Sequence, residues 1–126
     1  MKQKKISIRK LIQSFKFALN GLRILLCEER NAWIHFFIAF CVLAAGFILK
    51  ISKFEWIIIL LCIGFVFALE LLNTAIENIS DFVSKDYHLL IKKTKDLSAG
   101  AVLIGAITAA IIGLIIFTPK ILGLIY

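Results

Sequence analysis

Four polar side chains recur at helical spacing within one stretch of the chain, namely Glu70, Asn73, Glu77 and Asp81. At 100° per residue in an α-helix, the four project along a single stripe. Glu70 lies among apolar neighbours, and an ionisable group inside a membrane helix costs ~2.5–3.5 kcal/mol and usually faces a polar interior or marks function. Stacked carboxylates also suit Mg²⁺, which commonly binds one or two carboxylates together with substrate phosphates. The stripe therefore indicates a proton-transfer or metal site; the plainer interpretation is a helix that emerges into water at Glu77.

A second acidic pair, Glu28 and Glu29, precedes the first long apolar run, and Lys95 stands beside Asp96 before the last one. We expect the acids to lie at the depth of Glu77, and a lysine is a natural partner for a phosphate. Carboxylates, Mg²⁺ and lysines at a membrane interface suggest phosphoryl transfer to a lipid, a reaction whose catalysis is mostly positioning and charge neutralisation. The chain holds neither GxxxxGK[ST] nor GxGxxG. A kinase of this sequence would therefore not use a P-loop or protein-kinase plan.

The elements that must position these groups are membrane helices. Hydrophobic residues make up 61% of the 126 residues, and the mean hydropathy is +0.97; a soluble domain is roughly 45–50% apolar. Three runs, residues 32–49, 56–72 and 99–117, approach the ~20 apolar residues needed to cross a bilayer. The sequence predicts an all-α integral membrane fold with three transmembrane helices. This fold is expected to be one domain over residues 1–126, with a tight turn at 50–55 and a polar loop at 78–98.

An amphipathic helix is expected over residues 6–26, before the first span. Its apolar positions are Ile8, Leu11, Ile12, Phe15, Leu19 and Leu22. Basic and amide residues fall on the other side of the same helix. Such a helix would lie on the membrane surface, with its basic residues near anionic headgroups.

Basic residues are distributed unevenly over the two ends of the predicted spans. Residues 1–31 hold eight Lys and Arg and residues 78–98 hold four, whereas the opposite side holds three. Because Lys and Arg near helix ends are retained in the cytoplasm, the N-terminus and the 78–98 segment are predicted to be cytoplasmic and the C-terminus external. The net charge of +7 is then a topology signal. Binding to nucleic acid is disfavoured, because the basic residues are spread along a membrane edge.

The same residues carry a resemblance to a known family. The run from Glu70 to Asp81, the triplet Asp86-Tyr87-His88, and Lys95-Asp96 followed by Ser98-Ala99-Gly100 closely resemble the bacterial diacylglycerol kinase and undecaprenol kinase family. The similarity extends from Gly21-Leu22-Arg23 through the third span. It implies a homotrimer of three-span subunits in the bacterial cell membrane, with cytoplasmic active sites shared between neighbouring subunits.

The resemblance also implies roles for individual residues. Glu70 matches the general base that takes the proton from the lipid hydroxyl, and Glu29 and Glu77 match the carboxylates that bind Mg²⁺ and, with it, ATP. Asn73 matches a polar active-site residue, and Ala99 a position that contacts the lipid. The resemblance further implies contacts with ATP for Lys10, Phe17, Asp86, His88, Lys95 and Asp96. Of these, Lys10 stands where relatives have an arginine, and Phe17 where they have a tyrosine near the nucleotide.

The lipid substrate is also suggested by resemblance. Glu29-Arg30-Asn31 with Ile34-His35 resembles the Gram-positive, undecaprenol kinase-like branch, which implies phosphorylation of undecaprenol by ATP and Mg²⁺. Diacylglycerol is the alternative, because both lipids present a primary hydroxyl. No chemical role is assigned to Glu28 or His35.

Two other classes of protein stay open from the residues alone. One is a small ion-coupled transporter that uses Glu70 as its proton site. The other is an accessory subunit whose third span packs closely through small residues. Those small residues recur every four positions, at Ala101, Gly105, Ala109 and Gly113.

Overall fold

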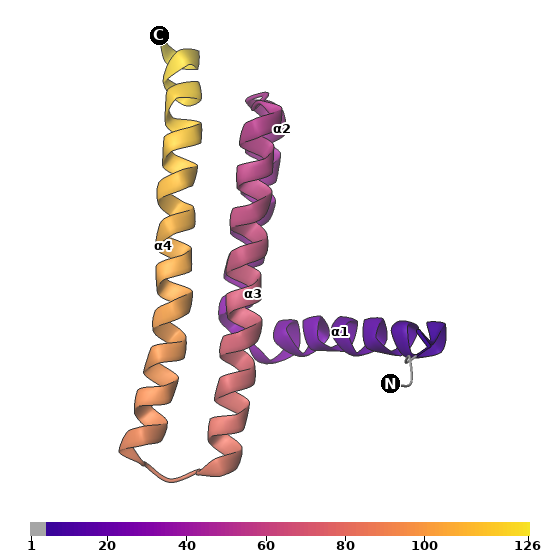
Figure 1. Cartoon of the computed structure of the whole chain (residues 1–126). Helices are drawn as coiled ribbons and strands as arrows, with labels where there is room; N and C mark the ends of the chain where they lie inside the picture. Colours follow the sequence, from indigo (N-terminus) through magenta and orange to yellow (C-terminus); the bar gives the residue numbers. More distant parts are fainter. Residues whose placement is uncertain (1–4) are drawn as a thin grey trace.

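The structure is a computed structural model that describes residues 5–126, so Lys2 and Lys4 of the basic N-terminal segment lie outside it. It consists of four helices in the order α1 (Ile8–Glu28), α2 (Arg30–Ile48), α3 (Lys53–Val83) and α4 (Leu89–Ile125), and the described residues contain no strand. Helices α3 and α4 run side by side in opposite directions, α2 packs against α3, and α1 points sideways out of the bundle (Figure 1). The predicted all-α fold, with a separate N-terminal helix before three long ones, is confirmed.

Three of the described helices, α2, α3 and α4, are long and apolar enough to cross a membrane. Many of their large apolar side chains face outward; Phe37 and Phe40 are both 67% exposed, and Ile104 is 69% exposed. An outward apolar surface is expected of helices solvated by lipid, because hydrocarbon buries these side chains without a protein core. The predicted membrane protein with three spans is confirmed.

The non-helical connection between the last two spans is much shorter than expected. Residues 78–98 were expected to form a loop, but α3 continues to Val83 and α4 begins at Leu89, which leaves only residues 84–88 outside a helix. The expectation equated polarity with loop, yet this stretch contains neither Gly nor Pro to break a helix. Within it, Lys92 and Asp96 form an i,i+4 ion pair of 2.6 Å along α4. With 31 and 37 residues, α3 and α4 are long enough to extend beyond ~30 Å of hydrocarbon.

The turn between α2 and α3 is tight, as predicted, and a capping box begins α3. Ser52 Oγ accepts a 3.2 Å hydrogen bond from the Glu55 backbone N–H, and Glu55 Oε2 accepts a 2.8 Å bond from the Ser52 N–H. These bonds satisfy two N–H groups that a helix start would otherwise leave free. Glu55 also lies 3.2 Å from Lys120 Nζ, which links α3 to α4 at this end of the bundle. Because of the cap, α3 starts at Lys53 rather than at Trp56.

Small residues set the closest helix contacts. On α2, Ala32 and Gly46 are buried, and a Cβ added to Gly46 would meet the Trp56 ring at 2.7 Å. On α4, Gly105 is the buried member of the predicted small-residue series, and a Cβ there would lie 2.5 Å from the Leu69 side chain. The absence of a side chain therefore lets α2 and α4 approach α3 closely, as expected of membrane helices.

Candidate active site

The polar stripe of α3 runs from the interior of the bundle toward the α3–α4 turn. Glu70 and Asn73 are buried, with 2% and 8% of their surfaces exposed; Glu77 is half-buried and Asp81 is exposed. The four residues share one face because they follow the helical repeat, as the sequence predicts. The stripe therefore places a carboxylate deep in the bundle and two more progressively nearer to its end.

A hydrogen bond between α3 and α4 anchors the middle of this stripe. The Ser98 hydroxyl donates to Asn73 Oδ1 at 2.7 Å, and both side chains are buried. The Asn73 amide nitrogen in turn donates to Glu77 Oε1 at 3.5 Å. Asn73 thus holds the Glu77 carboxylate from a fixed position. The sequence reasoning assigned no site role to Ser98, although it is a hydroxyl residue directly before the third apolar run. Its neighbour Ala99, the residue expected to contact the lipid, is exposed.

The carboxylate of Glu29, at the junction between α1 and α2, lies near the carboxylate of Glu77. It has an extended backbone between the two helices, with φ −107° and ψ 109°. Burial, followed by the Glu77 carboxylate, raises the pKa of Glu29. Beside it, Glu28 Oε2 accepts a 3.3 Å hydrogen bond from the Asn78 amide, which ties the junction to α3. Two acidic groups from separate elements therefore share one region, as the sequence predicts for Glu29 and Glu77.

Charged and polar residues gather at the Asp81 end of the stripe, near the connection between α3 and α4. Lys95 forms an ion pair with Asp81 across the two helices, and Asp96 pairs with Lys92 along α4. Asp86 and His88 lie in the 84–88 connection, where His88 Nδ1 caps α4 by accepting a 3.2 Å hydrogen bond from the Leu90 N–H. Four of the residues expected to contact a nucleotide are thus collected at one end of the bundle.

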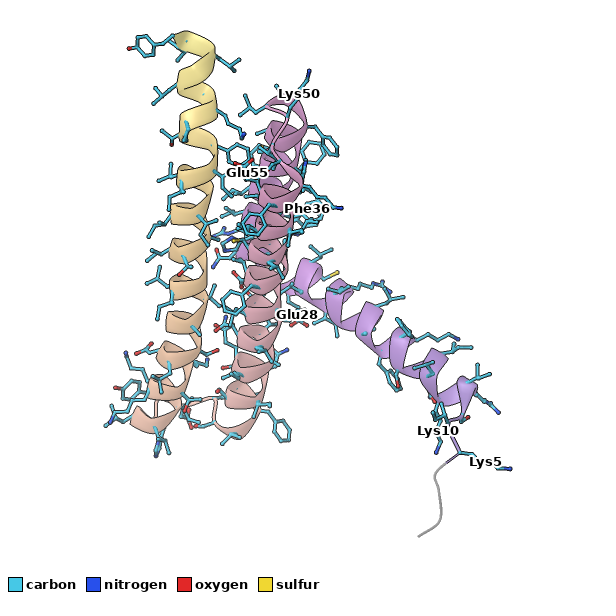
Figure 2. All side chains as sticks on the ribbon, turned by 45° about the horizontal axis from the view of Figure 1, so that its top comes forward. Lys5, Lys10, Glu28, Phe36, Lys50 and Glu55 are labelled. Atoms are coloured by element: carbon cyan, nitrogen blue, oxygen red, sulfur yellow. The ribbon has the colours of Figure 1, made fainter. Side chains whose placement is uncertain are left out.

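The two candidate residues on α1 are not collected there. Lys10 and Phe17 are exposed, and Lys10 lies toward the end of α1 remote from Glu28 (Figure 2). The 18 residue steps from Lys10 to Glu28 span ~27 Å of helix. Within one chain, α1 therefore carries Lys10 away from the carboxylates.

Glu70 has a partner that the sequence reasoning did not identify. His35 Nε2 on α2 lies 3.0 Å from Glu70 Oε1, and the two side chains are 22% and 3% exposed. The contact has the length of a hydrogen bond but is not aligned as one, and Oε1 has no other hydrogen-bond partner among the described residues. Helical spacing could have indicated this contact. His35 lies three residues after the buried Ala32, so both face α3 from the same side of α2.

An apolar groove of about 470 Å³ reaches His35, the partner of Glu70 in this pair. Residues of α2, α3 and α4 line it, among them His35, Val66, Phe67, Ala106 and Gly113. His35 thus belongs both to the groove and to the contact with Glu70. A molecule with a hydrocarbon chain in the groove and a polar head beyond it would bring that head to the buried carboxylate.

These features define a class of protein: a small multi-span helical membrane protein with a polar, carboxylate-rich site toward one end of its bundle. Residues 16–117 match the family described as prokaryotic diacylglycerol kinase. The chain belongs to this family. It is a membrane lipid kinase, with ATP as the phosphate donor and a lipid as the acceptor. The family membership favours the kinase over the transporter and the accessory subunit.

Individual relatives agree with this class. The chain is 44% identical to the undecaprenol kinase of Bacillus subtilis (strain 168), over 90% of this chain and 92% of that protein. It is 38% identical to a diacylglycerol kinase of Synechocystis sp., over 90% of this chain and 66% of that one. A diacylglycerol kinase of Helicobacter pylori (strain J99) is 31% identical, over 82% and 81% of the two chains. The relatives therefore include kinases named for two different lipids.

Proposed function

We propose that the protein transfers the γ-phosphoryl group of ATP to undecaprenol and so makes undecaprenyl phosphate. The choice of lipid is supported by the 44% identity to the Bacillus subtilis undecaprenol kinase, compared with 38% and 31% to the two diacylglycerol kinases. Diacylglycerol, with phosphatidic acid as the product, is the alternative acceptor, since it also presents a primary hydroxyl.

The observation that carries the proposal is the buried Glu70 carboxylate in contact with His35, a residue that lines an apolar groove. In the proposed reaction, the lipid chain lies in the groove and its hydroxyl approaches Glu70, with Ala99 in contact with the lipid. The hydroxyl oxygen bonds to the γ-phosphorus as the bond from that phosphorus to the ADP oxygen breaks. Glu70 takes the hydroxyl proton as general base, a role that typically contributes 10²–10⁴-fold to a rate.

Glu29 and Glu77 are the residues that would hold Mg²⁺. The raised pKa of Glu29 reflects burial and the neighbouring Glu77 carboxylate, both of which a bound cation would offset. Among the described residues no group of three or more His, Cys, Asp and Glu forms a metal cluster. A two-carboxylate site fits Mg²⁺, which fills its remaining positions with water and phosphate oxygens. The ion would supply neutralisation of the phosphate charge.

Lys95, Asp96, Asp86 and His88 are proposed to contact the nucleotide at the α3–α4 end of the bundle. The Lys95 and Asp81 side chains are 37% and 62% exposed, and such exposed pairs are worth only ~0–1 kcal/mol. Lys95 can therefore exchange Asp81 for a phosphate at little cost.

Lys10 and Phe17 would complete the nucleotide site from a neighbouring subunit, because α1 carries Lys10 away from its own chain's carboxylates. The number of subunits comes from the family resemblance, which implies a homotrimer in the bacterial cell membrane, and we propose that assembly for this protein. Its N-terminus and active sites would face the cytoplasm, where the excess of Lys and Arg is expected. Light scattering of the protein in detergent would test the trimer, and a monomeric, fully active enzyme would contradict the shared site.

One assay tests the choice of lipid. The purified protein is given ATP, Mg²⁺ and either undecaprenol or diacylglycerol, and the phosphorylated lipid is measured. We expect kcat/KM for undecaprenol to exceed that for diacylglycerol by at least about tenfold, or ~1.4 kcal/mol of transition-state stabilisation. Faster phosphorylation of diacylglycerol would make the alternative substrate the correct one.

A further inference from the structure

His35 occupies a packing position on α2 that apolar or small side chains otherwise fill. The residues at spacings of three and four along this face are Ala32, His35, Ala39, Val42 and Gly46, and each is buried or half-buried. A polar side chain within a membrane helix usually faces the bundle interior and has a function. His35 follows this rule, because its ring reaches α3 and places Nε2 3.0 Å from Glu70 Oε1.

The other polar groups near Glu70 are committed elsewhere. The Asn73 amide bonds Glu77 and accepts from Ser98, and the Thr74 hydroxyl donates to the backbone carbonyl of Glu70 itself at 3.0 Å. Glu70 Oε1 is buried without an aligned donor in the described part of the chain. A buried carboxylate oxygen without a donor is costly. The imidazole of His35 is the group at hydrogen-bond distance that can supply one.

We propose that His35 is a positioning residue for Glu70. Its Nε2–H, once the ring turns toward Oε1, holds that oxygen and leaves Oε2 to face the hydroxyl of a lipid alcohol at the end of the groove. Because His35 also lines the groove, the same ring places the head of the lipid relative to the base. This inference rests on the proposed function, in which Glu70 is the general base. His35 then acts on the rate of phosphoryl transfer through Glu70.

The test compares His35→Leu, His35→Gln, Glu70→Gln and the double variant His35→Leu/Glu70→Gln. We expect His35→Leu to lower kcat at least about tenfold, with the KM values for ATP and lipid within about twofold, because an orienting contact acts mainly in the transition state. His35→Gln should recover part of the loss, since its amide can donate. The double variant should be no slower than Glu70→Gln alone, because the two residues act as one unit.

Several results would overturn the proposal. Losses that multiply in the double variant would mean that His35 acts independently of Glu70. A changed KM with unchanged kcat would make it only a lining residue of the groove. Phe40→Leu, on the 67%-exposed side of the same helix, controls for altered packing of α2, and oligomer size is measured for every variant.

A second measurement does not depend on turnover. The infrared carboxyl band that Glu70→Gln removes is identified, and its frequency is compared between the wild type and both His35 variants. A shift in His35→Leu that His35→Gln partly reverses supports the contact, and an unshifted band overturns it. If the wild type phosphorylates neither lipid, the proposed function fails, and the infrared comparison then decides the His35–Glu70 contact by itself.

Discussion

Ser98 on α4 donates its hydroxyl hydrogen to the side-chain oxygen of Asn73 on α3 at 2.7 Å, and each residue is only 8% exposed. Through this bond α4 holds the amide that in turn reaches Glu77. The position of an acidic side chain on one helix is therefore set by a hydroxyl on another.

Removing that hydroxyl should loosen both the bundle and the site. We expect Ser98→Ala to cost about 1 kcal/mol of stability, because Asn73 Oδ1 loses its buried partner. It should also lower kcat/KM for ATP, because Glu77 is held less firmly. Unfolding in mixed detergents and steady-state kinetics measure the two effects. Thr108→Ala is the matched control, since the Thr108 hydroxyl donates to the Ile104 carbonyl of its own helix. An equal loss in both variants would contradict the role of Ser98.

Neutralising Glu70 should remove the base while leaving the protein assembled. Glu70→Gln keeps the size of the side chain, so we expect normal membrane insertion and oligomer size but a rate of lipid phosphorylation at least ~10²-fold lower. Oligomer size in detergent and phosphorylated lipid formed from ATP are measured side by side. Near-normal turnover in a correctly assembled variant would show that Glu70 is not the base.

Neutralising Glu77 should change the metal requirement. Because Glu77→Gln removes one of two proposed carboxylate ligands, we expect the Mg²⁺ concentration for half-maximal activity to rise about tenfold or more, the scale of a lost ligand worth ~1.4 kcal/mol. High Mg²⁺ should then restore part of the rate. Glu28→Gln makes the same change of charge at the neighbouring junction, where Glu28 bonds Asn78. An unchanged Mg²⁺ dependence in Glu77→Gln, or an equal change in Glu28→Gln, would contradict the proposal that Glu77 binds Mg²⁺.

The raised pKa of Glu29 predicts how stability depends on pH without metal. Burial and Glu77 favour the protonated form, so the folded protein binds more protons than the unfolded chain between the ordinary pKa of 4.5 and the raised one. Stability should therefore fall as pH rises through this window, and Glu29→Gln should reduce the fall. Thermal unfolding in EDTA, at a series of pH values from 4.5 upward, measures this fall in stability. Added Mg²⁺ should oppose the fall in the wild type, and identical pH slopes in the wild type and Glu29→Gln would contradict the prediction.

The orientation that the basic residues predict for the bundle can be tested by labelling. After replacement of the three native cysteines, Lys53→Cys should react with an impermeant reagent from outside, and Lys85→Cys only from the cytoplasm. Lys53 begins α3 and Lys85 lies in the 84–88 connection, so they mark opposite ends of that helix. Labelling of position 53 from the cytoplasmic side alone would reverse the topology.

The sequence by itself determined the three spans, the preceding helix and the polar stripe of α3. These features depend on hydropathy and on the helical repeat, which are properties of each segment alone. Family membership was also readable from local motifs, because Glu70 to Asp81 and Lys95-Asp96 lie within short stretches of the chain.

Only the tertiary structure decided which side chains meet. His35 and Ser98 stand in short motifs that carry the family resemblance, but those motifs do not say what either side chain contacts. Their contacts come from the approach of α2 and α4 to α3, which brings His35 to Glu70 and Ser98 to Asn73. Residues 78–83 and 89–98 are helical for local reasons, because the stretch contains neither Gly nor Pro and forms the i,i+4 pair of Lys92 and Asp96. The tertiary structure adds the ion pair between Lys95 and Asp81, which forms across the two helices. Contacts between helices depend on close packing at small residues such as Gly105, and the geometry of that packing belongs to the assembled bundle rather than to any one segment.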